Sequence, residues 1–293
     1  MSVAGLMLAG CSSEEISAPQ TDGTEMNEQL QVSISMNSLA RVTDAAYETG
    51  DNVGLYIVNY NEDAPGALQA SGNHADNAKF TKAVSEWTPA TPIYWKDKTT
   101  KADFYCYYPY AAGMSTTAYS FAVKEDQSSE ANYKASEFLW GKATGVAPTK
   151  EAVNITTDRL MSNIIVKLVR GKGFTEEAWA ATTICVKVCS TKPAATINLS
   201  TGVAIATGAA KEITPLKVSE GYRAMIVPQT ITADQPLLNI TVNGDTYAYK
   251  KAFTFVANKR HHFSITINKI KDGIDIGIGG WGDDGTDHGG TAE

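Results

Sequence analysis

The residue types with the clearest chemistry stand at the start of the chain. Leu8, Ala9 and Gly10 precede Cys11, and small residues before a cysteine are typical of a bacterial lipoprotein signal. In such a signal the cysteine is acylated and becomes the mature N-terminus, so we predict lipidation of Cys11. The apolar run of residues 1–11 is short and has no Lys or Arg before it, so we expect the true signal to start upstream. Residues 12–29 are polar and predict a flexible tether.

A second candidate for chemistry is the peptide bond between Arg41 and Val42. The residues that follow, VTDAAYETGDN, are polar and contain a glycine, which indicates an exposed turn that a trypsin-like protease can reach. Proteolysis after Arg41 would separate everything before it from the rest of the chain. An ordinary first strand followed by a loop with a surface arginine explains the same pattern.

The chain lacks the sequence patterns of common catalytic sites. It has no GxSxG elbow, P-loop, HExxH zinc motif or GxGxxG before a helix. His261 and His262 are adjacent on an expected strand and therefore face opposite sides, so they are not suited to bind one metal ion together. The acidic tail at residues 283–288 lacks the spacing of a calcium-binding EF-hand loop. We predict no metal site, no cofactor and no enzymatic activity.

Composition narrows the class of protein further. The chain has 293 residues, with 25 Lys and Arg against 32 Asp and Glu, and a formal net charge of -7, which argues against nucleic-acid binding. Its length suits two domains. Beyond Cys11, an odd number of cysteines remains, which is not a disulfide framework. We expect Cys106, Cys185 and Cys189 to be buried free thiols.

The segment that must position the arginine is LQVSISMNSLAR, residues 30–41. Leu30, Val32, Ile34 and Met36 alternate with polar residues, so one face of an extended strand is apolar. Burying each such side chain is worth roughly 1.5–3 kcal/mol before entropy is subtracted. Removing this strand from a folded domain would leave an apolar groove.

Nearly every other periodic segment also has the period of a strand. In the aromatic run of residues 102–110, Phe104 and Cys106 point one way and Tyr105 and Tyr107 the other, which favours strand packing over sugar stacking. One helical turn is expected at residues 175–179, and a tight hairpin turn at Asn243 and Gly244. We predict an all-β sandwich architecture, with one domain at residues 30–150 and a second at residues 151–293.

The C-terminal end contains a second amphipathic extended segment. Ile274, Ile276 and Ile278 alternate with Asp and Gly up to Trp281. A strand-shaped end beyond the last domain strand is what strand addition between molecules requires. A final strand of the second domain fits the pattern equally well.

The order of several motifs resembles the fimbrillin family of Bacteroidales, the FimA and Mfa-like pilins. These motifs are LAGC, an arginine before GDNVGLYI, TPIYWKD, DFYCYYPY, EDQSS, SEFLWG, LMSNIIVKL, IVPQT and a closing Ile and Trp. The resemblance implies two transthyretin-like β-sandwich domains in tandem and transport to the outer membrane as a lipoprotein.

The same resemblance assigns roles to residues. An Arg-specific maturation protease would cut after Arg41, Val42 would become the new N-terminus, and the strand from Leu30 to Met36 would be removed. A donor segment, here residues 274–281, would fill the groove of another subunit, giving a fimbrium that supports adhesion. The tail beyond Trp281 has no further alternating strand, which leaves open a short donor, or a tip or accessory subunit in place of a stalk subunit.

One alternative belongs to another class of protein. A cell-surface lipoprotein that stays monomeric could bind glycans through its aromatic side chains, and the candidates are Trp87, Trp95, Tyr105 and Tyr107. Measurable affinity of a monomer for oligosaccharides would favour it.

Overall fold

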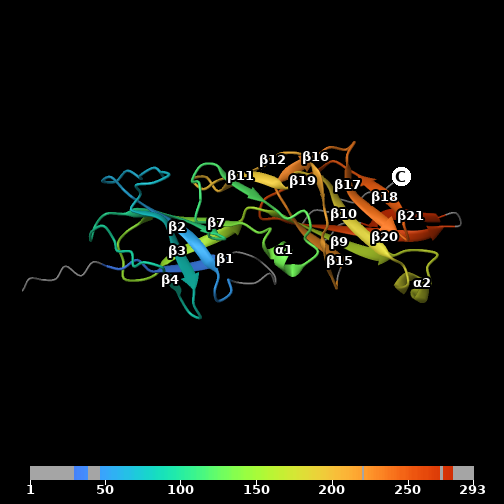
Figure 1. Ribbon diagram of the computed structural model, residues 1–293, viewed down its shortest axis with the longest axis horizontal. Coiled ribbons are helices and arrows are strands. Elements are labelled where there is room, and N and C mark those ends of the chain that lie inside the picture. Colours follow the sequence, from blue (N-terminus) through green and yellow to red (C-terminus); the bar gives the residue numbers. More distant parts are fainter. Residues whose placement is uncertain (1–29, 39–46, 220, 271–272, 280–293) are drawn as a thin grey trace, which may run out of the picture.

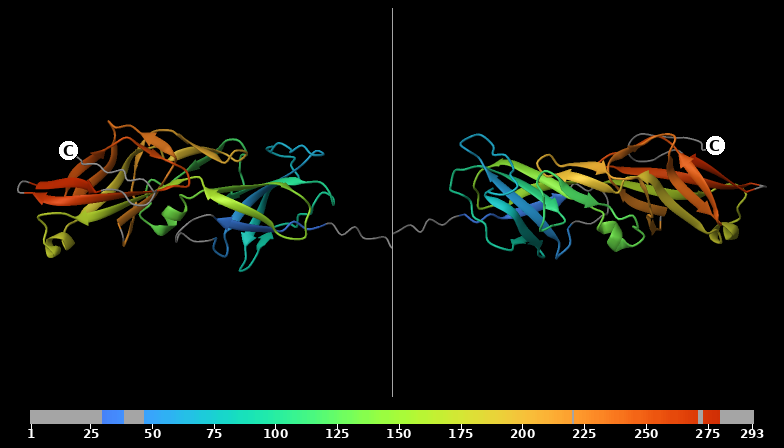
Figure 2. Two further views of the ribbon diagram at one scale, coloured as in Figure 1. Left: turned by 180° about the vertical axis from the view of Figure 1, so that it is seen from behind. Right: turned by 45° about the horizontal axis from the view of Figure 1, so that its top comes forward.

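The protein is an elongated, nearly all-β molecule in the computed structural model (Figure 1). The structure describes residues 30–38, 47–219, 221–270 and 273–279. The first strands lie at one end of the long axis and the last strands at the other, and the views of Figure 2 agree. The all-β prediction is confirmed.

A seven-stranded sheet occupies the N-terminal end of the molecule. Its strands, in spatial order, are β1 (Ile34–Ser38), β8 (Val153–Arg159), β7 (Leu139–Val146), β5 (Ala102–Tyr108), β2 (Asn52–Asn59), β3 (Ala75–Lys82) and β4 (Trp87–Pro89). β1 runs parallel to β8, and every other neighbouring pair is antiparallel. The domain boundary predicted at residue 150 lies before β8. The chain leaves the seven-stranded sheet later, between Arg159 and Ser162.

Two larger sheets and a small ribbon occupy the C-terminal end. The five-stranded sheet has the order β14 (Leu216–Val218), β15 (Gly221–Ile226), β9 (Ser162–Arg170), β20 (Arg260–Ile270) and β21 (Gly273–Gly279). The four-stranded sheet has the order β13 (Lys211–Ile213), β10 (Ile184–Thr191), β17 (Pro236–Val242) and β18 (Asp245–Lys250). β16 (Gln229–Ile231) pairs with β19 (Phe253–Phe255). The turn between β17 and β18 is the predicted one, since Asn243 and Gly244 both have positive φ angles, 51° and 103°.

A three-stranded sheet and a buried amide tie the two ends together. β6 (Tyr119–Ala122) comes from the N-terminal part of the chain, yet it pairs with β11 (Ala194–Asn198), which also pairs with β12 (Val203–Thr207). The fully buried Gln127 side chain accepts from the Met225 amide at 2.8 Å and donates to the Met225 carbonyl at 2.8 Å. The side chain therefore pairs with β15 as a neighbouring strand would.

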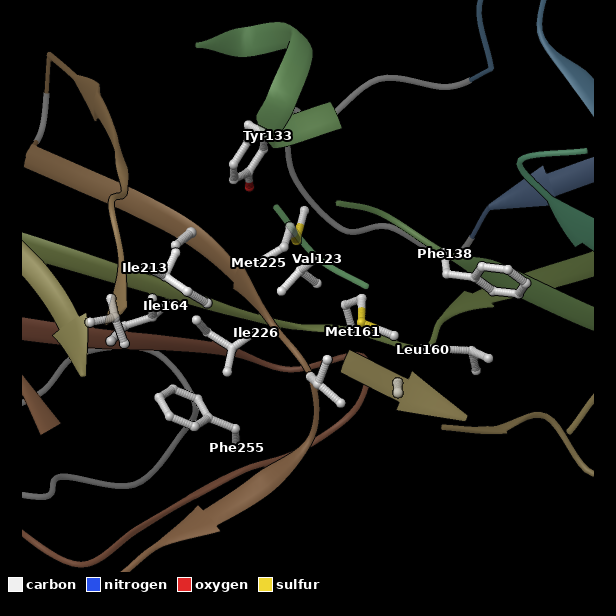
Figure 3. Packing of buried hydrophobic residues seen from close by; sticks show 14 of the residues in the cluster. Val123, Tyr133, Phe138, Leu160, Met161, Ile164, Ile213, Met225, Ile226 and Phe255 are labelled. Carbon is white, nitrogen blue, oxygen red and sulfur yellow. The ribbon is translucent and has the colours of Figure 1, made fainter. Parts of the chain in front are cut away.

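The two helices of the described residues are single short turns. α2 (Glu176–Ala180) lies where a helical turn was predicted, and its N-cap Thr175 accepts from the Ala178 amide. α1 (Glu130–Lys134) was not predicted from sequence; the Ser129 side chain caps it. Tyr133 points from α1 into the core of the C-terminal sheets, toward Met225 and Val123 (Figure 3).

The strands of the N-terminal sheet contribute to two separate cores. Phe104 and Cys106 face one core, and Tyr105 and Tyr107 on the same strand face the other, as the alternation predicted. The first core is enclosed by the seven-stranded sheet. The second is continuous with the C-terminal sheets (Figure 3). The expectation of buried thiols is correct for Cys106 and Cys189 and wrong for Cys185, because that side chain lies on the solvent face of β10.

Candidate functional site

The extended segment at residues 30–38, which we call the N-terminal segment, contacts two separate parts of the seven-stranded sheet. Its first residues run along the stretch after β4. The Val32 amide donates to the Ile93 carbonyl at 2.7 Å, and the Trp95 amide donates to the Leu30 carbonyl at 2.8 Å. Its later residues form β1 on the edge of β8, where Ile34 pairs with Val153 and Ser38 with Thr157.

These contacts make the N-terminal segment a closing strand. β8 and β4 lie at opposite sides of the sheet in strand order, so one short segment connects the two sides of a curved sheet. Without it, the outer edge of β8 and the backbone around Tyr94 would lose their hydrogen-bond partners. Unpaired edges of this kind are ready to accept another strand.

The apolar face of the N-terminal segment completes the core beneath it. Val32 and Ile34 are buried, with exposed fractions of 1% and 4%, and Leu30 and Met36 are half-buried against the same core. The four side chains singled out by alternation therefore lie together. At roughly 1.5–3 kcal/mol for each fully buried side chain, Val32 and Ile34 alone contribute several kcal/mol.

A thiol lies directly under this face. Cys106 is fully buried, and its Sγ lies 3.5 Å from the Met36 Sδ. Burial raises the pKa of the Cys106 thiol well above its usual range, so the group is neutral and inert in the folded protein. The alternation of residues 104–108 placed Cys106 on the correct face, but sequence reasoning did not place it under the N-terminal segment.

Aromatic rings support the far end of the N-terminal segment. Tyr47 packs edge-on against Trp87 and Tyr108, at centroid distances of 5.1 and 5.7 Å. Its hydroxyl lies 2.8 Å from the Thr157 Oγ1, on the residue that pairs with Ser38. Desolvation by burial, and then the neighbouring Cys106, raise the pKa of Tyr47. Sequence reasoning missed Tyr47, because a lone tyrosine in a polar stretch carries no periodic signal.

The C-terminal segment is held differently. β21 pairs antiparallel with β20 through the register from Ser264 opposite Gly279 to Ile270 opposite Gly273, and it is the edge strand of its sheet. Ile274 is half-buried against the C-terminal core. Ile276 and Ile278 pair by backbone with Ile267 and Ile265. Cys11, Arg41, Val42 and Trp281 lie outside the described residues.

The described residues offer little that resembles a catalytic or metal centre. No cluster of three or more His, Cys, Asp or Glu able to hold a metal occurs among them. In the same part of the chain, no helix is long and apolar enough to cross a membrane. His261 is buried beside the rings of Phe253 and Phe255, whereas its neighbour His262 is only half-buried on the other side of β20.

The aromatic residues of the glycan-binding alternative do not form a surface. Tyr107 is fully buried, and the exposed fractions of Trp87, Trp95 and Tyr105 are 7%, 3% and 5%. Trp95 packs edge-on against Phe104, and Tyr107 stacks on Phe138. Because these rings are packed inside the two cores, this alternative is not favoured.

Fold and site together define an all-β protein that is organised around its terminal strands and shows no catalytic constellation in the described residues. The chain matches the fimbrillin-like family over residues 40–281, and it belongs to that family. The match begins beside Arg41, after the N-terminal segment, and ends at Trp281.

Individual relatives agree with this assignment. The chain is 29% identical to the Bacteroides uniformis protein named "Putative fimbrium subunit Fim1C", over 94% of this chain and 90% of the relative. A solved structure described as a cell adhesion protein from Bacteroides uniformis is 23% identical and has a TM-score of 0.64, covering 85% of this chain and 96% of its own. A similar protein from Bacteroides ovatus is 18% identical with the same TM-score, covering 86% and 96%. The two solved structures support the fold alone.

Proposed function

We propose that the protein is a structural, non-enzymatic subunit of a fimbrium that supports adhesion at the cell surface. It is exported as an outer-membrane lipoprotein with the lipid on Cys11. An Arg-specific protease then cuts between Arg41 and Val42, and subunits assemble by strand exchange. The observation that carries this proposal is the position of the N-terminal segment, which closes the curved sheet and is held by backbone pairing on both sides.

Cleavage after Arg41 would convert this closing strand into a separate peptide. While the chain is intact, the segment is held at a high effective concentration; once cut, it can dissociate. Its loss uncovers the apolar positions now covered by Val32 and Ile34 and frees the edge of β8. A strand from another subunit then gains both apolar burial and backbone hydrogen bonds, so association is strong.

The C-terminal segment is the donor in this proposal, with Ile274, Ile276, Ile278 and Trp281 as its apolar residues. β21 is an edge strand, paired on one side in the described residues, so its release disturbs its sheet less than loss of the N-terminal segment disturbs the first sheet. Two transthyretin-like sandwiches in tandem would place acceptor and donor at opposite ends of the subunit, and β1 and β21 lie near opposite ends (Figure 2).

Limited digestion of the unlipidated protein with an Arg-specific protease tests the proposal. We expect a single early cut between Arg41 and Val42, followed by multimers that persist on an unboiled denaturing gel. Intact mass measurement identifies the bond that is cut, and the gel shows whether the subunits have assembled into multimers.

Two variants distinguish the cleavage step from the assembly step. Arg41→Lys removes the cleavage site with its charge retained, and this variant stays uncut and monomeric. A chain that ends at residue 272 lacks the donor; it is cut normally but stays monomeric. Resistance of the natural Arg41 bond, or multimers that form equally without cleavage, would contradict the proposal.

A further inference from the structure

β12 is an edge strand that presents apolar side chains to solvent. β11 pairs with one side of it, and no strand of the described residues pairs with its other side. Ala204 and Ala206 pack against the core of the C-terminal sheets. Val203 and Ile205 point the other way, with exposed fractions of 48% and 63%. An exposed edge strand with apolar side chains is ready to pair with another strand.

The outer face of the three-stranded sheet is built without charged residues. β12 contributes Val203, Ile205 and Thr207 to this face. The residues that follow across the sheet are Ala194, Thr196 and Asn198 on β11 and Ser120 and Ala122 on β6. Residues 193–210 and 104–123, which contain the three strands, include no Asp, Glu, Lys or Arg. Because the chain has a net charge of -7, a second copy of it meets the least like-charge repulsion at such a face.

Five other edge strands carry features that hinder pairing. β4 ends at Pro89, and β13, β14, β18 and β21 each contain at least one charged residue. Charged residues and proline on an edge protect it from pairing with another chain. β12 has neither, so nothing in its own sequence blocks a partner strand.

The hairpin that ends in β12 is held in a fixed position. The Trp140 Nε1 on β7 donates to the Leu199 carbonyl at 2.7 Å, next to the turn between β11 and β12. In that turn Gly202 has a φ angle of +67°, and an added Cβ would lie 2.3 Å from the Trp140 ring. The turn is therefore seated on the indole, and the edge is already formed before a partner arrives, which lowers the entropy cost of pairing.

We propose that β12 is a docking edge for a second copy of this chain, with β12 of one copy pairing antiparallel to β12 of the other. A twofold axis at Ile205 places Ile205 opposite Ile205 and Val203 opposite Thr207, so the strand is complementary to itself. Cross-strand pairs of β-branched side chains stabilise such a ladder. The two three-stranded sheets become one sheet of six strands.

A single contact of this kind is weak. Five paired residues bury less than the roughly 1,200 Å² of a stable interface, so we expect a dissociation constant of about 1 mM. Repeated along a fibre, the contacts would reinforce one another and hold neighbouring fibres side by side. That consequence rests on the proposed fimbrium. The pairing itself does not, because β12 lies between the two ends of the molecule, away from β1 and β21 (Figure 1).

Disulfide trapping on the uncleaved, unlipidated chain tests the proposal. In a Cys11→Ser, Cys185→Ser background the remaining thiols, Cys106 and Cys189, are buried. Facing Cα atoms of an antiparallel pair lie about 4.5–5.5 Å apart, which suits a disulfide, so Ile205→Cys should form a covalent dimer when an oxidant is added. The control is Val84→Cys, at a side chain that is 88% exposed, and it should react at least about tenfold more slowly. Equal rates would overturn the proposal.

Two further cysteine variants test the register. Val203→Cys alone should not dimerise, because the two copies of residue 203 would lie four residues apart, about 13 Å along the strands. A mixture of Val203→Cys and Thr207→Cys chains should form a mixed dimer about as fast as Ile205→Cys does. Dimers of Val203→Cys that form equally fast would exclude the proposed strand pairing.

A charged variant and a truncated chain complete the test. Ile205→Lys should weaken self-association at least about fivefold in sedimentation equilibrium, whereas Val84→Lys should leave it unchanged, and circular dichroism verifies that both variants fold. A chain that ends at residue 272 should still be trapped through Ile205→Cys. Loss of trapping in that chain would show that β12 receives the C-terminal segment instead of another β12. Since no step requires cleavage after Arg41, this proposal and strand exchange fail separately.

Discussion

The two terminal strands of this protein are both short, amphipathic and extended, yet they are held in different ways. The N-terminal segment connects two sides of one sheet and buries Val32 and Ile34. β21 lies along β20 at a sheet edge, and Ile274, the one β21 side chain whose burial is described, is half-buried. Loss of the first opens a groove with a core at its floor, whereas loss of the second exposes mainly the edge of β20. If subunits exchange strands as proposed, the way in which each terminal strand is paired distinguishes the acceptor end from the donor end.

The largest expected effect concerns the reactivity of Cys106. Its Sγ lies under Met36 and is fully buried, so maleimide labelling requires opening of the N-terminal segment. We therefore use a chain that ends at residue 272, which has no donor to refill the groove. After its cleavage at Arg41 and release of that segment, we expect labelling to accelerate about a hundredfold or more, since opening no longer costs several kcal/mol. Peptide mapping of a Cys11→Ser, Cys185→Ser variant measures it.

Cys189 and a truncated chain serve as controls for this experiment. Cys189 is buried near Glu212 in the four-stranded sheet, and its labelling rate should not change. The same chain before cleavage, without β21 but with the N-terminal segment attached, should also leave Cys106 unreactive. If truncation of β21 exposes Cys106 as much as cleavage does, the two strands are not held differently in the way described.

Single substitutions should show the same contrast on the scale of folding stability. Ile34→Ala removes a buried side chain from the closed core and should lower the free energy of unfolding by about 2–4 kcal/mol. Ile274→Ala removes a half-buried one from an edge strand and should cost about 1 kcal/mol. Urea denaturation of both variants gives the two values. Equal costs would mean that β21 is anchored as firmly as the N-terminal segment.

Much of this arrangement follows from local pattern. Alternation at residues 30–36 predicted the apolar face that the structure buries, and alternation at residues 104–107 predicted which side chains face each core. Pairing partners could not be predicted, because the contact of residue 31 with residue 94 and of β1 with β8 depends on the curvature of the whole sheet. α1 was missed because it lies in a polar stretch of the sequence, which indicates a turn between strands as readily as a helix.

The glycan-binding alternative shows the limit of sequence patterns more clearly. The sequence pattern did draw attention to aromatic residues, but to those with the strongest strand periodicity. Strong periodicity indicates burial, so the same signal selected rings that are packed inside the cores.

The smallest predicted effect is a loss of folding stability at high pH, caused by ionisation of Tyr108, whose ring packs against Tyr47 beside the N-terminal segment. Desolvation, and then the charge of Asp51, raise the pKa of Tyr108 from 10.0 to about 12. The folded protein favours the protonated phenol of Tyr108 more than the unfolded chain does. The resulting contribution to stability is complete below pH 10 and is lost as the pH rises toward 12. Tyr108 is half-buried, so we expect a loss of about 1 kcal/mol instead of the roughly 2.7 kcal/mol that two pKa units would give.

Tyr108→Phe separates this effect from the general action of alkali. The variant loses the hydrogen bond from the Tyr108 hydroxyl to the Asp51 Oδ1, so at pH 8 it should be less stable than the natural protein by about 0.5–1 kcal/mol. Between pH 10 and 12 the gap should close, because phenylalanine has no proton to lose. Urea denaturation at both pH values measures it. A constant gap would show that ionisation of Tyr108 does not weaken the sheet that the N-terminal segment closes.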